Sequence, residues 1–200
     1  MKIGKFVALA GLVGLLAVGL AHAQRQIDDT PDTAVPARAS PPSPSGAVAH
    51  QYEAILGDNS GIAPAMFVKM AALGGMTEVE IGKIAQAKAN DPNVRKFADE
   101  MIKDHSKANA ELATLAKTKG LAVPVALDSE HEAIVQRLKS MPSTDFDAAY
   151  SRQMVESHDK TIALFEGATK SSDDDIAAFA KKTLPTLERH KQMADSLPTS

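Results

Sequence analysis

FADEMIKDHSKANAEL (residues 97–112) and YSRQMVESHDKTIALF (residues 150–165) share one pattern, in which an aromatic residue, a methionine and a histidine follow at four-residue steps. Side chains four positions apart lie on one face of an α-helix, so each histidine is predicted to face the core beside its methionine. An inward histidine needs a partner, because burying an unpaired polar group is costly. The repeat therefore predicts two core helices that carry either a metal centre or a hydrogen-bonded polar centre.

Helical patterns continue on both sides of this repeat, and no stretch alternates polar and apolar residues as a strand does. The predicted helices cover about 63–89, 92–119, 129–139 and 143–167, and a last helix starts at 172. Four long helices and one short helix in the longer middle connection predict an all-α fold. We expect an antiparallel four-helix bundle with a short crossover helix.

Capping residues and helix breakers mark the expected ends of these helices. Asp91 is expected to cap the second helix and Gly120 to end it. Further N-caps are expected at Ser129, at Ser143 or Thr144, and at Ser172. Pro185 is expected to kink the last helix, and Gly74 with Gly75 to admit a close neighbour in the first.

Residues 1–23 have the pattern of a secretory signal peptide. Lys2 and Lys5 precede an apolar run, and Ala21-His22-Ala23 fits a small-x-small cleavage site. The apolar run is shorter than the ~20 residues of a membrane span, so we expect cleavage and no stable span in the mature chain. A retained membrane anchor is the alternative.

Residues 24–59 are rich in Pro, Ala and Ser and carry few apolar side chains that could be buried. This composition predicts a disordered tether. The folded domain is then predicted over residues 60–197, which is an ordinary length for one domain. With the signal peptide, this arrangement predicts a secreted protein of the periplasm.

The composition excludes several classes of site. The chain contains no Cys, so a disulfide framework and thiolate metal ligands are excluded. Removing Lys2 and Lys5 lowers Lys+Arg from 22 to 20 against 25 Asp+Glu, a net charge of −5, so no basic surface for nucleic acid is expected. No nucleophile elbow or similar catalytic motif is present, so an enzyme is not favoured, and no protein partner is indicated.

Each long helix carries one metal-competent residue on its predicted inward face: Glu78, His105, His158 and His190. Counted from the turns that join the helices, Glu78 and His105 are at about the same height. The same count separates His158 from His190 by roughly 6 Å, unless the kink at Pro185 compensates. These ligand types suit Zn, Cu(II) or Fe, with Asp104 as an outer or alternative ligand.

Two other interpretations remain open from the sequence. The histidines can be structural, hydrogen-bonded to Glu78, to Tyr150 or to each other, in a non-enzymatic envelope or stress-associated module. Alternatively, the sulfur atoms of Met101, Met154 and Met193 could serve Cu(I), although methionine at helical spacing is usually core filler.

Residues 67–194 resemble a bacterial family of secreted proteins, the domain of unknown function family 4142. The resemblance rests on GMTEVEIGKIA (75–85), FADEMIKDHSKANAEL (97–112), FDAAY (146–150) leading to His158, and FAKKTLPTLERH (179–190). It implies a ferritin-like bundle and an envelope location, and the family has no established activity.

The chain departs from the ferritin-like di-iron pattern, in which two helices each carry a Glu-x-x-His pair. The positions three residues before the inward histidines hold Ile102, Val155 and Leu187. The sequence therefore argues against di-iron chemistry and leaves a mononuclear, histidine-rich site or a vestigial one.

Overall fold

The computed structural model describes residues 62–200, so the predicted signal peptide (1–23) and tether (24–59) lie outside the described residues. The helices are α2 (Pro64–Lys88), α3 (Pro92–Thr118), α4 (Ser129–Ser140), α5 (Ser143–Ala168) and α6 (Asp174–Asp195). No strand occurs within residues 62–200. The predicted all-α class is confirmed.

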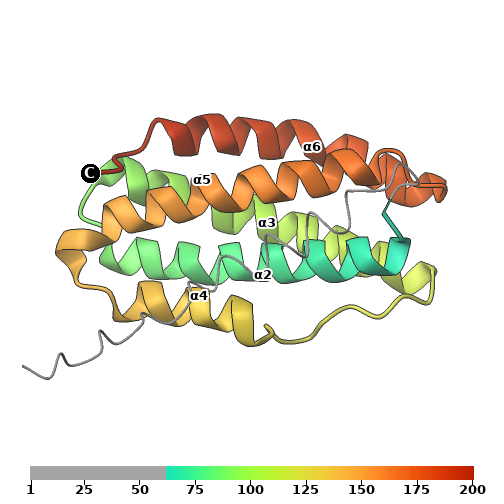
Figure 1. Cartoon of the computed structure of the whole chain (residues 1–200), viewed down its shortest axis with the longest axis horizontal. Coiled ribbons are helices and arrows are strands. Elements are labelled where there is room, and N and C mark those ends of the chain that lie inside the picture. Colours follow the sequence, from blue (N-terminus) through green and yellow to red (C-terminus); the bar gives the residue numbers. More distant parts are fainter. Residues whose placement is uncertain (1–61) are drawn as a thin grey trace, which may run out of the picture. The chain divides into compact units, whose positions relative to one another are not determined.

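Four long helices lie side by side, with the short helix α4 along the outside of α2 (Figure 1). Helix α2 packs against α3, α4 and α5, whereas α6 packs against α5 and α3. Short turns join α2 to α3 and α5 to α6, so the members of each pair are antiparallel. This arrangement brings the inward faces of all four long helices to a shared interior.

Two of the predicted N-caps lie one residue away from their expected positions. Asp128, and not Ser129, caps α4 by accepting a hydrogen bond from the backbone N–H of His131 at 3.0 Å. Asp173, and not Ser172, caps α6 and accepts from two backbone N–H groups at 3.1 Å. In both cases an ionised carboxylate replaces a neighbouring hydroxyl, because charge-assisted hydrogen bonds are the stronger ones.

Of the other predicted helix ends, some are confirmed and one is wrong. The Asp91 cap is confirmed, with its carboxylate 2.6 Å from the backbone N of Asn93. Gly120 follows α3 with φ of 65°, the left-handed conformation that glycine adopts without strain. Helix α5 has Pro142 at its N-cap position and no side-chain cap, so the expected cap at Ser143 or Thr144 is wrong. Proline fixes a φ that suits this boundary without a capping hydroxyl.

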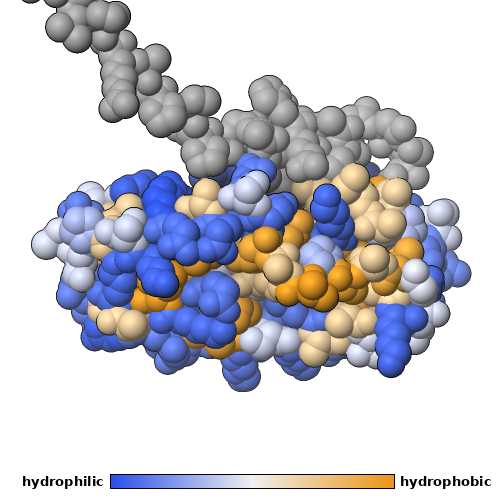
Figure 2. All heavy atoms as spheres, turned by 90° about the horizontal axis from the view of Figure 1, so that it is seen from below, coloured by the Kyte–Doolittle hydropathy of each residue, from blue (hydrophilic) through white to orange (hydrophobic). Residues whose placement is uncertain are grey.

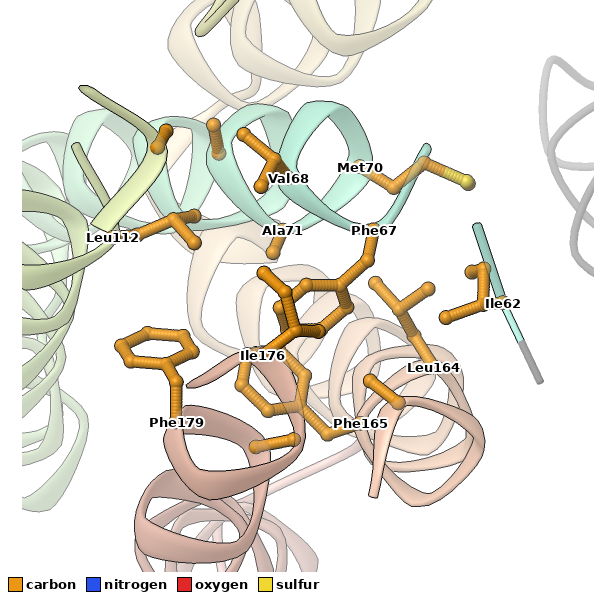
Figure 3. Packing of buried hydrophobic residues seen from close by; sticks show 14 of the residues in the cluster. Ile62, Phe67, Val68, Met70, Ala71, Leu112, Leu164, Phe165, Ile176 and Phe179 are labelled. Atoms are coloured by element: carbon orange, nitrogen blue, oxygen red, sulfur yellow. The ribbon is translucent and has the colours of Figure 1, made fainter. Parts of the chain in front are cut away.

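The apolar core consists of two clusters, and every long helix contributes to both. The first cluster includes Phe67, Phe165 and Phe179, with the rings of Phe67 and Phe165 edge to face at 5.0 Å (Figure 3). The second includes Phe97 and Tyr150. On each long helix, the predicted metal-competent residue lies between the part that enters one cluster and the part that enters the other.

Close helix approach occurs at Gly75 and Gly82 and not at Gly74. A Cβ on Gly75 would lie 2.1 Å from Oδ1 of Asn109, and one on Gly82 would lie 2.9 Å from Cγ1 of Ile102. At Gly74 the nearest atom would be 3.9 Å away, an ordinary contact. Helix α2 therefore needs its glycines on the side that faces α3.

The surface shown in Figure 2 is largely hydrophilic, with hydrophobic side chains gathered near the middle of that face. Within residues 62–200, none of the helices combines the length and the apolar character that crossing a membrane requires.

Candidate metal centre

The four residues predicted on the inward faces meet in the interior, one from each long helix. Their exposed fractions are 1% for Glu78, 5% for His105, 0% for His158 and 1% for His190. The three imidazole rings are 5.4 to 5.7 Å apart between centroids. One nitrogen from each ring lies within 4.8 Å of the other two.

In each ring, one nitrogen is held by an oxygen of the protein. Nδ1 of His105 lies 3.0 Å from Oε2 of Glu78. Nδ1 of His158 lies 2.9 Å from the carbonyl oxygen of Met154 and 3.5 Å from Oε1 of Glu78. Nε2 of His190 lies 3.0 Å from Oδ2 of Asp104. The hydrogen bonds to Met154 and Asp104 fix the rings of His158 and His190, and the ring of His105 lies against Glu78.

The second nitrogen of each ring has no hydrogen-bond partner among residues 62–200. These atoms are Nε2 of His105, Nε2 of His158 and Nδ1 of His190, and all three are fully buried. An unpartnered buried nitrogen is costly, and three in one place are unusual. The two carboxylate oxygens of Glu78 also lack a well-aligned hydrogen bond, although they lie against His105 and His158.

Burial sets the protonation of this centre. It raises the pKa of Glu78 from 4.5 to about 8 and lowers the pKa of His158 from 6.5 to about 4. Burial, followed by repulsion from the other two histidines, also lowers the pKa of His105 well below 6.5. Burial lowers the pKa of His190, against the opposing effect of Asp104. Near pH 7 the metal-free centre is thus close to neutral, with a protonated Glu78 and uncharged histidines.

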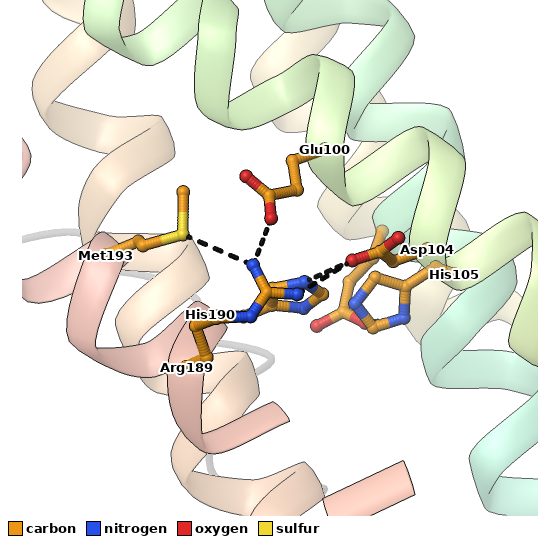
Figure 4. A network of polar contacts seen from close by, with 7 residues as sticks. Glu100, Asp104, His105, Arg189, His190 and Met193 are labelled. Atoms are coloured by element: carbon orange, nitrogen blue, oxygen red, sulfur yellow. Dashed lines mark hydrogen bonds and ion pairs between the residues drawn. The ribbon is translucent and has the colours of Figure 1, made fainter. Parts of the chain in front are cut away.

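Asp104 links the buried centre to the surface of the domain. Its Oδ2 accepts from Nε2 of His190 and from Nη2 of Arg189, both at 3.0 Å (Figure 4). Burial raises the pKa of Asp104, but the hydrogen bonds from His190 and Arg189 outweigh it and leave the pKa below its usual value. Arg189 also pairs with Glu100. Asp104 is therefore an ionised carboxylate directed at His190.

A closed wall lies on one side of the centre. The ring of Phe97 is 6.5 Å from that of His158, and Tyr150 and Met154 are fully buried beside them. Burial, and after it the charge of Glu78, raise the pKa of Tyr150 above its usual value. The tyrosine hydroxyl has no hydrogen-bond partner within residues 62–200, and the raised pKa keeps it a neutral phenol.

A small cavity of about 30 Å³ lies on the other side. It is bordered by Glu78, His105 and His190 but not by His158, and its remaining walls are mostly apolar. The apolar lining includes Ala71, Leu112, Phe165, Phe179 and Leu187. The centre is therefore asymmetric, because only two of its three histidines border free space.

Residues 57–197 match the family described as Domain of unknown function (DUF4142). The chain belongs to the DUF4142 family. None of the functionally curated proteins matches the chain.

Two crystal structures of DUF305 proteins are similar in fold to the DUF4142 chain. A fragment from Deinococcus radiodurans has a TM-score of 0.59 at 14% identity, covering 66% of this chain and 92% of the other. A candidate secreted protein from Streptomyces coelicolor has a TM-score of 0.57 at 14% identity, covering 68% and 90%. At this identity the likeness concerns the fold alone.

One pair in the DUF4142 domain meets in spite of the axial offset expected from the height count. It separated His158 from His190 by one turn, yet their rings are 5.6 Å apart. Side chains lean toward the N-terminus of their own helix. His158 therefore leans away from the α5–α6 turn and His190 leans toward it, which narrows the offset from both sides. Helix α6 also continues through Pro185, and this leaning brings the two rings together without a bend in the helix.

Sequence reasoning missed Arg189 and Glu100, which complete the network around Asp104. Glu100 and Asp104 are one helical turn apart, and Arg189 adjoins His190. This spacing can be read from the sequence, but it does not indicate that these residues of α3 and α6 lie next to each other. The sulfur atom of Met193 lies 3.8 Å from Nη1 of Arg189, so it belongs to this outer network.

Proposed function

We propose that the DUF4142 domain binds one first-row divalent transition-metal ion through His105, His158 and His190. The observation that carries this proposal is the pairing of the ring nitrogens. In every ring one nitrogen lies against a protein oxygen, and the other is buried with no partner in the described part of the chain. Histidine ligands of metals are held in this way, since an outer oxygen fixes the tautomer and the lone pair of the other nitrogen faces the ion.

Glu78 and Asp104 take the outer positions in this proposal. Glu78 lies against the Nδ1 atoms of His105 and His158, and Asp104 against Nε2 of His190. Binding of a cation would displace the proton of the Glu78 carboxyl group, leaving a carboxylate to balance part of the added charge. Glu78, which the sequence offered as a ligand, is here an orienting group.

A set of three imidazoles suits Zn(II) and Cu(II) best, with Fe(II) as a further candidate. The sulfur of Met193 lies against Arg189, and Met101 and Met154 belong to the apolar cluster that contains Phe97. These contacts support a site of nitrogen ligands and give no support to Cu(I) held by sulfur.

The alternative is a purely structural role for the histidines. The contact of 3.0 Å between His105 and Glu78 favours it. A structural role would nevertheless require the remaining nitrogens to be satisfied by the protein, and three are not. The metal-site hypothesis accounts for all three at once.

We also propose that the domain acts outside the cytoplasm and is a ferritin-like, antiparallel four-helix bundle. The signal-like pattern in residues 1–23 supports export to the periplasm. One structural neighbour, described as a candidate secreted protein, agrees with it. The two antiparallel helix pairs that surround a buried polar centre support the ferritin-like bundle.

The test is metal uptake by the mature chain without an affinity tag. Protein stripped with a chelator is dialysed against Zn(II) or Cu(II), and bound metal is measured by elemental analysis. We expect one equivalent for the wild type and for His131→Gln, a histidine on α4 outside the centre. His158→Gln should lose the metal while keeping its helical circular dichroism. No uptake by the wild type, or equal uptake by His158→Gln, would refute the proposal.

A further inference from the structure

We propose that the bound ion keeps one coordination position open toward the cavity, and that this position takes one small exogenous ligand, water or a small inorganic anion. This inference rests on the proposed metal site and deepens it. It distinguishes a reactive centre from a structural one, because structural zinc sites have four protein ligands whereas reactive sites have three and an open position.

The surroundings of the centre are asymmetric. On the side of His158, Phe97 and Tyr150 belong to the apolar core, so a fourth ligand cannot enter there. His105 and His190 border the cavity on the opposite side. An ion held by the three histidines would therefore have its remaining position directed at free space.

The cavity beside the centre is small. A buried site needs roughly 10–15 Å³ of this kind of volume to hold one water molecule. The cavity has about 30 Å³, which is room for about two water-sized atoms or a short linear anion. An imidazole ring is too large. The volume therefore sets an upper limit on the ligand.

A second hollow adjoins the cavity on the side of the solvent. A wider hollow of about 210 Å³ lies between α3 and α6 and is bordered by Lys107, Lys182 and Arg189. It shares Asp104, Ala108, Thr183 and Thr186 with the inner cavity. Three cationic side chains thus stand where a small anion would enter. Two of them are paired with carboxylates, Lys182 with Glu111 and Arg189 with Glu100 and Asp104.

Ala108 offers a way to fill this space without touching a ligand. It borders both hollows, so a leucine there would occupy the cavity and its entrance. Ala110 lies on the same helix and is exposed, which makes Ala110→Leu a matched control.

The experiment loads the mature protein with Co(II) and follows its visible spectrum during titration with azide, and separately with imidazole. We expect azide to shift the spectra of the wild type and of Ala110→Leu in a saturable way. Ala108→Leu should bind Co(II) but need at least about tenfold more azide, the equivalent of 1.4 kcal/mol. Imidazole should leave the wild-type spectrum unchanged over the same range.

The outcomes separate the two proposals. Uptake of Co(II) without any response to azide would overturn the open position and leave the metal site standing. The same holds if azide binds Ala108→Leu as tightly as the wild type, or if imidazole binds as well as azide. Failure to bind Co(II), Zn(II) and Cu(II) at all would overturn the proposed function itself.

Discussion

Glu78 governs the charge of the buried centre at the scale of single residues. Its carboxyl group is surrounded by α2, α3 and α5 and lies against two imidazoles. Without a nearby fixed cation, burial favours its neutral form, and for the same reason the histidines stay neutral. The centre therefore binds protons differently from the unfolded chain, and stability must depend on pH.

The metal-free protein should be most stable between about pH 6 and 7. As pH falls below 6.5, the unfolded chain protonates histidines that stay neutral in the native state, so stability is lost toward the folded pKa of about 4. As pH rises from 4.5 to about 8, the unfolded chain loses the Glu78 proton that the native state keeps, which lowers stability. Above pH 6.5 only this second effect remains, at about 1.4 kcal/mol per pH unit.

Urea melts in a chelator from pH 5 to 8.5 measure this dependence. In Glu78→Gln the decline above pH 6.5 should disappear, because glutamine has no proton to lose. A wild-type stability that stays level or increases between pH 6.5 and 8 would contradict the neutral carboxyl at Glu78.

Asp104 should raise the affinity for the metal, because its hydrogen bond orients the ring of His190. Loss of such an outer carboxylate typically weakens metal binding about 10- to 100-fold. We expect Asp104→Asn to raise the dissociation constant for Zn(II) by this factor, measured by competition with a chromophoric chelator. Glu111→Gln is the matched control, since Glu111 lies on α3 like Asp104 and pairs with Lys182 of α6. Equal effects of the two substitutions would assign the loss to general surface charge.

At the scale of helices, the spacing of apolar residues predicted which residues lie on the inward stripe of each helix. It could do so because this spacing is read along one helix at a time. The four stripes placed Glu78 and all three histidines in the interior. Caps shifted by one residue where an aspartate adjoined a serine, since either side chain can reach the free N–H groups. Which nitrogen of a ring meets which oxygen depends on contacts between helices, and these follow from packing that no single stripe encodes.

The glycines of α2 offer a test of helix packing. Gly74→Ala should stabilise the domain by up to about 1 kcal/mol, because alanine is the better helix former and the added Cβ meets only an ordinary contact. Gly82→Ala should destabilise it, because its Cβ would press on Cγ1 of Ile102 at 2.9 Å and on the backbone oxygen of Ala98 at 3.4 Å. Thermal melts of the two variants compare them directly, and an equal shift in both would show that α2 and α3 do not approach as described.

At the scale of the whole domain, a polar centre separates two apolar clusters that share all four long helices. An ion bound to three histidines would tie α3, α5 and α6 together at that level. Glu78 would hold α2 to the same centre through its contacts with two of these histidines. Metal binding and folding would then be linked, since the ion binds only the folded arrangement.

The most direct measurement is the X-ray absorption spectrum of the mature protein loaded with one equivalent of Zn(II). The proposed site predicts three imidazole nitrogens at about 2.0–2.1 Å, one further light atom and no sulfur. A spectrum with fewer than two imidazoles, or with sulfur in the coordination sphere, would contradict the assignment of His105, His158 and His190 as the ligands.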